Sequence, residues 1–99
     1  MGENIADLGG LLLALDAYHA SLNGAASPVI DAFTGGWARV WRAKSRPDAL
    51  KQQTPTDSHS PARFRVDGPM RNIDAWYDAF AVKPGDKLYL DPQDRVRIW

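Results

Sequence analysis

Two carboxylates near the start of the chain have a spacing that could serve a binding or catalytic site. Glu3 and Asp7 lie four residues apart and lead into a long apolar run. Residues at positions i and i+4 of a helix share one face, so a helix over residues 3–22 would present both carboxylates on the same side. Most of the circumference of this helix is apolar, which predicts that it is buried. Buried carboxylates need a counter-charge, so we expect a metal ion, a cationic side chain or a histidine beside them.

A second group of reactive side chains lies in the second half of the chain. His59 follows Asp57 by two residues, a spacing at which the carboxylate could hold the imidazole ring. Arg65 stands between Phe64 and Val66, and this alternation predicts an extended stretch in which Arg65 points away from its apolar neighbours. A single histidine and a single arginine in a loop are more often ordinary surface residues, so these two alone do not establish a site.

Both groups belong to longer patterns that resemble one known family. The nonapeptide G-E-N-I-A-D-L-G-G at residues 2–10 is similar to a signature of the neprilysin-like zinc metallopeptidases, the M13 family. The pattern D-x-H-S-P-x-x-F-R-V-x-G-P at residues 57–69 resembles a second region of that family, in the expected order. The stretch N-I-x-x-W-Y-x-A-F and the terminal R-V-x-I-W resemble its far C-terminus. The resemblance covers nearly the whole chain, but only the last part of the family's catalytic domain.

The resemblance implies roles for four residues in the zinc-dependent hydrolysis of peptide bonds. Glu3 would be the third zinc ligand, and Asp7 would orient a zinc-binding histidine. His59 would donate a hydrogen bond to the oxyanion that forms during hydrolysis, and Arg65 would bind the peptide substrate next to the cleaved bond. Relatives are usually cell-envelope or extracellular proteins, so analogy suggests that location, although the sequence itself leaves the compartment unknown.

The chain lacks part of the machinery that this reaction needs. Zinc hydrolases of this type take two ligands from an H-E-x-x-H motif, whose glutamate is the general base. The chain has no such motif, and its only histidines are His19 and His59. We therefore expect residues 1–99 to be one unit, the C-terminal segment of a zinc metalloendopeptidase, inactive without the remainder that carries H-E-x-x-H. The alternative is a small non-catalytic helical interaction domain that keeps the peptidase scaffold.

Composition argues against several other classes of function. Lys and Arg number 12 and Asp and Glu 12, so the net charge of zero gives no footprint for nucleic acid. Trp37 and Trp41 with nearby arginines could stack on bases, but two core tryptophans beside a solvated basic face fit the neutral charge better. His19 is interpreted as an ordinary histidine rather than a metal ligand. There is no cysteine and no run approaching 18 apolar residues, so no thiolate zinc site and no membrane span are expected.

Apolar spacing and cap signals predict a mainly helical fold. Four helices are expected near residues 3–22, 36–44, 47–53 and 72–80, with a further short helical turn from Ser27 to Phe33. Residues 56–70 are expected to form a long ordered loop, because Pro61, Gly68 and Pro69 disfavour a helix. The alternating residues at the C-terminus predict an extended tail.

The expected core comes from the apolar positions of three helices. Its members are Leu8, Leu12, Leu15, Trp37, Trp41, Trp76 and Phe80. Gly9 and Gly10 cost the first helix about 1 kcal/mol each relative to alanine, which predicts close packing on that side. The small residues Gly10, Ala14, Ala17 and Ser21 form a stripe along this helix. Without the rest of a catalytic domain this stripe would be uncovered, so self-association of the chain is a further expectation.

Overall fold

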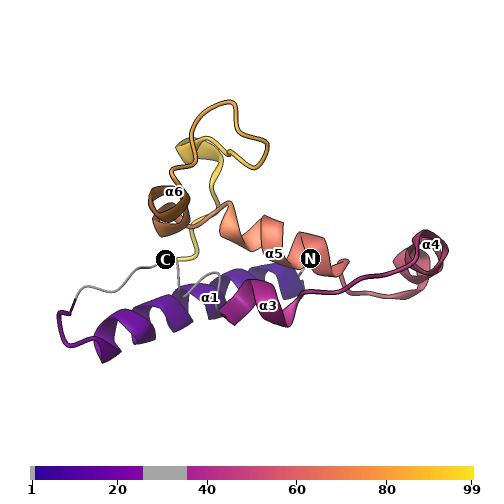
Figure 1. The fold of residues 1–99 in the computed structure, drawn as a ribbon, viewed down its shortest axis with the longest axis horizontal. Coiled ribbons are helices and arrows are strands. Elements are labelled where there is room, and N and C mark those ends of the chain that lie inside the picture. The colour runs from indigo at the N-terminus through magenta and orange to yellow at the C-terminus, as the bar shows by residue number, and fades with distance from the viewer. Residues whose placement is uncertain (1, 26–35) are drawn as a thin grey trace.

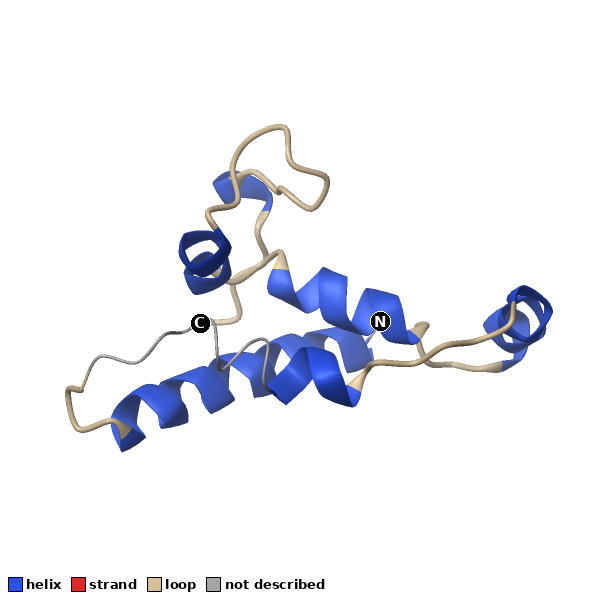
Figure 2. Ribbon diagram, viewed as in Figure 1, coloured by secondary structure: helices blue, strands red, loops and turns tan. Residues whose placement is uncertain are grey.

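The chain folds into helices joined by loops. The computed structural model describes residues 2–25 and 36–99, which contain helices and turns but no strand (Figure 1; Figure 2). The elements are α1 (Gly2–Ser21), α3 (Ala38–Val40), α4 (Pro47–Thr56), α5 (Ala62–Met70), α6 (Asp74–Phe80) and the 3₁₀ turn η2 (Pro92–Asp94). The mainly helical fold is therefore confirmed, while the turn expected from Ser27 to Phe33 lies outside the described residues. Within these ranges, no helix is long and apolar enough to cross a membrane.

Helix α1 agrees with the predicted first helix and buries one face of it. That face consists of Asp7, Leu8, Leu11 and Leu15. The helix is followed by Asn23 and Gly24, both with positive φ, and a glycine adopts this conformation without strain. His19 is exposed. An added Cβ at Gly9 would lie 3.7 Å from Ile98 Cδ1, whereas one at Gly10 would meet no described atom within 4 Å. Among the described residues, the expected close packing is therefore made at Gly9 and not at Gly10.

The segment expected to be an irregular loop contains helix α5, so that prediction was wrong for residues 62–70. The helix starts after Pro61, which has an extended conformation (φ −53°, ψ 146°). Pro69, interpreted as a breaker, is accommodated in the last turn, and Pro69 and Met70 are buried. Packing of α5 along α1 outweighs the low helix propensity of this segment. The ordered loop is confined to the residues between α4 and α5.

Two other helix boundaries differ from the prediction. Helix α3 is shorter than the predicted helix over residues 36–44, because Trp41 has left the helical conformation (φ −89°, ψ 7°). Helix α4 extends past the predicted end at Gln53, with Pro55 inside its last turn. Helix α4 projects away from the other helices (Figure 1), and all of its described side chains are exposed.

Helix α6 begins two residues later than the predicted start at residue 72, with Ile73 at the N-cap position. The side chain of Asn72, at the predicted start of this helix, binds two other segments. Its side-chain oxygen accepts a hydrogen bond from the Val96 N–H, and its side-chain nitrogen donates to the Gly68 carbonyl, each at 2.7 Å. Ala81, with φ 51°, ends the helix.

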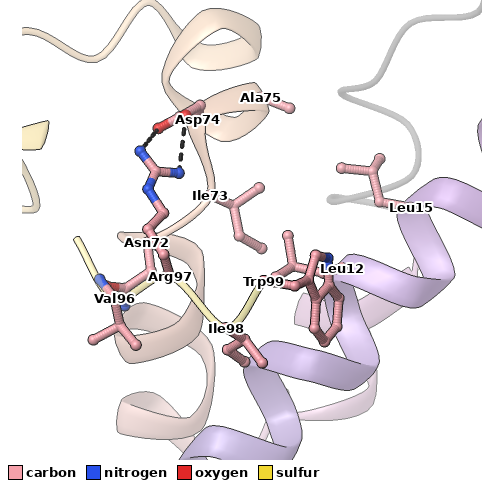
Figure 3. A pocket seen from close by; sticks show the side chains of 10 residues that line it. All are labelled: Leu12, Leu15, Asn72, Ile73, Asp74, Ala75, Val96, Arg97, Ile98 and Trp99. Atoms are coloured by element: carbon pink, nitrogen blue, oxygen red, sulfur yellow. Dashed lines mark hydrogen bonds and ion pairs between the residues drawn. The ribbon is translucent and has the colours of Figure 1, made fainter.

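The C-terminal tail is extended, as predicted, and is fastened back onto α6. Arg95 donates to the Asp74 carboxylate at 2.7 Å and to the Leu90 carbonyl at 3.1 Å, and its guanidinium carbon lies 3.6 Å from the Tyr77 ring centroid. Arg97 donates to the same carboxylate at 3.1 Å. The hydrogen bonds from Arg97 and Arg95 lower the pKa of Asp74. A pocket of about 220 Å³ lies between this tail, α1 and α6 (Figure 3).

The hydrophobic core is small. Its buried members are Leu8, Leu11, Leu15, Met70, Ile73, Trp76 and Tyr77. Of the seven residues expected in the core, three are buried, namely Leu8, Leu15 and Trp76. Three more are half-buried, namely Leu12, Trp37 and Trp41. The burial expected for Phe80 was wrong, because its side chain is 38% exposed.

Candidate active site

The four residues singled out in the sequence lie together near the N-terminus of α1. Glu3 and Asp7 occupy the first two turns of α1, His59 lies in the loop between α4 and α5, and Arg65 is on α5. Helices α1 and α5 pack side by side (Figure 1). This packing brings Asp7 and Arg65, which are 58 positions apart in the sequence, into direct contact.

Asp7 and Arg65 form a two-pronged ion pair. Arg65 Nε donates to Asp7 Oδ2 and Arg65 Nη2 donates to Asp7 Oδ1, each at 2.7 Å. The side chains of Arg65 and Asp7 are 16% and 9% exposed, so the pair is largely shielded from solvent. The hydrogen bonds to Asp7 raise the pKa of Arg65. Arg65 is thus the cationic partner expected for Asp7, and the predicted extended stretch was wrong because a helix turns Arg65 towards α1.

Trp41 stacks against the same guanidinium group. Its ring centroid lies 3.9 Å from Arg65 Cζ, a cation–π distance. Trp37 packs edge-on against Trp41, with 5.6 Å between ring centroids. The indole N–H of Trp41 is buried and makes no hydrogen bond to any part of the chain that the structure describes. The two tryptophans, interpreted as core residues in the sequence, therefore border the site.

Trp37 also completes the hydrogen bonding of α5. Its Nε1–H donates to the backbone carbonyl of Arg65 at 3.1 Å. In an α-helix, that carbonyl accepts from the N–H four residues later, but this residue is Pro69, which has none. Trp37 therefore supplies the hydrogen bond that Pro69 cannot make, at the residue that carries the guanidinium.

His59 lies between two carboxylates. Its Nδ1 is 2.8 Å from Asp57 Oδ1, and its Nε2 is 3.0 Å from Glu3 Oε1. The backbone N–H of His59 also donates to Asp57 Oδ1, at 2.9 Å. The contact expected from the spacing of Asp57 and His59 is therefore present. Because carboxylates only accept hydrogen bonds, each of the two ring contacts is a hydrogen bond only when the nitrogen concerned carries the proton.

Asp57 is held by contacts to both of its oxygens. Gln53 Nε2 donates to Asp57 Oδ2 at 2.8 Å, while His59 occupies Oδ1. The hydrogen bond from Gln53, followed by those from the backbone and ring of His59, lowers the pKa of Asp57 from 3.8 to about 2. The carboxylate therefore remains ionised throughout the neutral range and can hold the ring.

A pocket of about 420 Å³ opens beside these residues. Its lining includes Trp41, Leu50, Gln53, Asp57, His59 and Arg65. Its lining combines apolar side chains with a guanidinium, an imidazole and a carboxylate.

The Glu3 carboxylate is a suitable zinc ligand, but the described residues do not form a complete zinc site. A catalytic zinc site takes three protein ligands. No group of three or more histidine, aspartate or glutamate side chains gathers as a metal site in residues 2–25 and 36–99. Glu3 can therefore supply one ligand, and the others would have to come from outside these residues.

Sequence reasoning missed three residues that hold the site. Trp37 and Trp41 were assigned to the core because their spacing is that of an amphipathic helix, and Gln53 was not singled out. The spacing of Gln53 and Asp57 as i and i+4 was a usable signal, since such pairs face each other on a helix. Nothing local in the sequence shows that a tryptophan would meet Arg65.

Comparisons with known proteins match the chain over its whole length. The chain is 43% identical over 99 residues to a neutral endopeptidase of Lactobacillus helveticus, covering 100% of this chain and 14% of that protein. It is 34% identical over 108 residues to membrane metallo-endopeptidase-like 1 of Homo sapiens, covering 100% of this chain and 14% of that protein. The chain thus spans about one-seventh of the length of these relatives.

A solved structure and a family model cover nearly the whole chain. The Mycobacterium tuberculosis zinc metalloprotease Zmp1, solved in complex with an inhibitor, is 53% identical with a TM-score of 0.88, over 99% of this chain and 16% of that one. The model of peptidase family M13 matches residues 1–96. The chain belongs to peptidase family M13.

Proposed function

We propose that the chain is the C-terminal segment of the catalytic domain of a zinc-dependent endopeptidase, with residues 1–99 forming one unit. The observation that carries this proposal is the convergence of Glu3, Asp7, His59 and Arg65 from two halves of the sequence. Family membership supplies the reaction class, and relatives of known name are peptidases. The substrate is a peptide, and the partner is the remainder of the domain, which carries H-E-x-x-H. By analogy with the relatives, the enzyme works in the cell envelope or outside the cell.

Glu3 is proposed as the third zinc ligand. In enzymes of this kind, the bound zinc polarises the scissile carbonyl and lowers the pKa of the attacking water. Glu3 is at the start of α1, where its carboxylate is accessible on the side that faces His59. Its neighbour one turn later, Asp7, is proposed to orient a zinc-binding histidine. Both oxygens of Asp7 already accept from Arg65, but each retains a lone pair for a second donor.

Arg65 is proposed to bind a substrate carbonyl next to the cleaved bond. Its Nε and Nη2 are occupied by Asp7, and Nη1 makes no hydrogen bond within the described residues. The guanidinium is held by Asp7 on one edge and by the Trp41 ring on a face. A donor fixed before substrate arrives loses little side-chain entropy on binding.

His59 is proposed to stabilise the oxyanion of the tetrahedral intermediate. Asp57 occupies Nδ1, so Nε2 is the nitrogen that can change partners when a substrate binds. A donor placed in advance where negative charge develops favours the transition state over the ground state. This assignment predicts an effect of His59 on kcat rather than on KM.

The test is the activity of the intact gene product that contains this segment. The wild type should cleave a quenched fluorescent peptide, and Glu3→Gln should abolish turnover with loss of bound zinc. Asp16→Asn is the matched control, since Asp16 is an exposed carboxylate on the same helix, and it should retain activity. A reading frame without H-E-x-x-H upstream of Met1, together with no cleavage, would instead support the non-catalytic interaction domain.

A further inference from the structure

We propose that Gln53 is a positioning residue that holds Asp57, and through Asp57 fixes the ring of His59 for catalysis. The inference rests on the proposed function, because the orientation of His59 matters for rate only in an active peptidase. It concerns a residue that lies outside both sequence patterns by which the segment resembles its family.

The contact joins the last turn of α4 to the loop that carries His59. Gln53 Nε2 donates to Asp57 Oδ2 at 2.8 Å, and the Asp57 backbone N–H donates to the Gln53 carbonyl at 2.9 Å. Asp57 is therefore attached to Gln53 through both its side chain and its main chain. With Oδ2 fixed in this way, Oδ1 is directed at the backbone N–H and the Nδ1 of His59.

Because both oxygens of Asp57 are hydrogen-bonded, its carboxylate cannot rotate freely, and this fixes the position of the His59 ring. A carboxylate with one bound oxygen can rotate about its terminal torsion, which is broad. Rotation of Asp57 would release Nδ1, and Nε2 would then lose its direction towards α1. The link is independent of Glu3, because Gln53 and Asp57 act on the opposite nitrogen from the one that faces Glu3. The lowered pKa of Asp57, whose largest cause is Gln53, fits the same geometry.

The test compares substitutions at Gln53 in the intact enzyme. Gln53→Ala should lower kcat roughly threefold to tenfold, less than the hundredfold that a 1 Å misplacement can cause, and change KM by less than about twofold. Gln53→Glu should lower kcat further, because it places a second carboxylate against Asp57. Lys51→Ala is the control, an exposed residue on the same helix, and should leave both constants unchanged.

A double-mutant cycle separates positioning from direct contact with the substrate. If Gln53 acts through Asp57, Gln53→Ala should have no further effect in an Asp57→Ala background. Equal effects of Gln53→Ala in both backgrounds, or an unchanged kcat in Gln53→Ala alone, would overturn the proposal.

A crystal structure of the intact Gln53→Ala variant gives a readout that does not need activity. We expect the His59 ring to lose its contact with Asp57 or to occupy more than one orientation. A ring unchanged from the wild type would overturn the inference about Gln53. An inactive wild-type enzyme, by contrast, would overturn the proposed function, and the ring position would still decide the role of Gln53.

Discussion

Two tryptophans hold Arg65 of the site in different ways. Trp37 and Trp41 are both tryptophans at the edge of α3, yet their indole N–H groups differ. The N–H of Trp37 satisfies the carbonyl that Pro69 leaves open on α5, whereas that of Trp41 has no hydrogen bond to the described residues. The contribution of Trp41 is its ring face, which lies against Arg65.

This difference between the two N–H groups predicts that the same substitution costs stability at Trp37 but not at Trp41. Trp37→Phe should destabilise the fold by about 1 kcal/mol or more, because it leaves the half-buried Arg65 carbonyl without a donor. Trp41→Phe should be close to neutral, since it keeps an aromatic face and removes an N–H that has no partner in the described structure. Thermal unfolding of both variants gives the comparison. Equal losses in the two would contradict the role assigned to the Trp37 N–H.

The contacts of Asp57 predict that the stability of the fold falls at low pH. Its pKa is about 2 in the folded chain against a usual 3.8, so the ionised form is favoured by folding. The stabilisation is therefore fully present above pH 3.8 and is lost as the pH falls through about 2. Carbon-13 NMR of the Asp57 carboxyl should show this low midpoint, and Gln53→Ala should move it upwards. A midpoint near 3.8 in the wild type would show that the contacts from Gln53 and His59 are not formed in solution.

Four residues of the candidate site were singled out from the sequence, whereas Trp37, Trp41 and Gln53 were not assigned to it, and the contacts among these residues were predicted only in part. The spacing of Asp57 and His59 gave a correct local contact, because two residues within one turn of chain can meet whatever the fold. The need of Asp7 for a partner was also correct. The partner is Arg65 because α5 packs on α1, and no local sequence pattern predicts this packing. The assigned catalytic roles stay predictions.

At the scale of elements, the prediction succeeded where local pattern and packing agree. Helix α1 has its apolar periodicity, its capping glycine and its buried face in agreement, and its bounds were close to those observed. Helix α5 has little amphipathic character and contains Gly68 and Pro69, and it packs against α1. The expected extended tail is present, but its fastening to α6 by Arg95 could not be foreseen, since Asp74 is 21 residues away.

The contacts of the C-terminal tail predict a large difference in stability loss between substitutions of Arg95 and Arg97. Arg95 is 8% exposed, binds Asp74 and the Leu90 carbonyl, and lies on the Tyr77 ring. Arg95→Ala should destabilise the fold by roughly 2–4 kcal/mol, through lost hydrogen bonds and a lost cation–π contact. Arg97 shares the Asp74 partner but is 52% exposed, so Arg97→Ala should cost about 0.5 kcal/mol or less. Urea denaturation of the two variants would test this, and similar midpoints would contradict it.

The whole molecule is less compact than a typical domain of its length. Its radius of gyration is 14.9 Å, against about 13 Å expected for 100 residues. Its accessible surface is 7076 Å², against roughly 5,600 Å² expected for a folded monomer of this mass. The projecting α4 (Figure 1) and the exposed side chains of α1 contribute to this excess. These exposed side chains of α1 keep self-association of the chain as a prediction, which sedimentation velocity can test.

The isolated chain should neither bind zinc tightly nor cleave peptides. Among its described residues only Glu3 is a credible ligand, and one carboxylate gives weak binding in place of the three-ligand site that catalysis needs. His59 and Arg65 would keep their contacts to Asp57 and Asp7, but they would have no activated water to assist. Calorimetric titration with zinc, beside a fluorogenic peptide assay on the same sample, makes the measurement. Sub-micromolar zinc binding with turnover that Glu3→Gln abolishes would show that the chain is an enzyme by itself, with ligands outside the described residues.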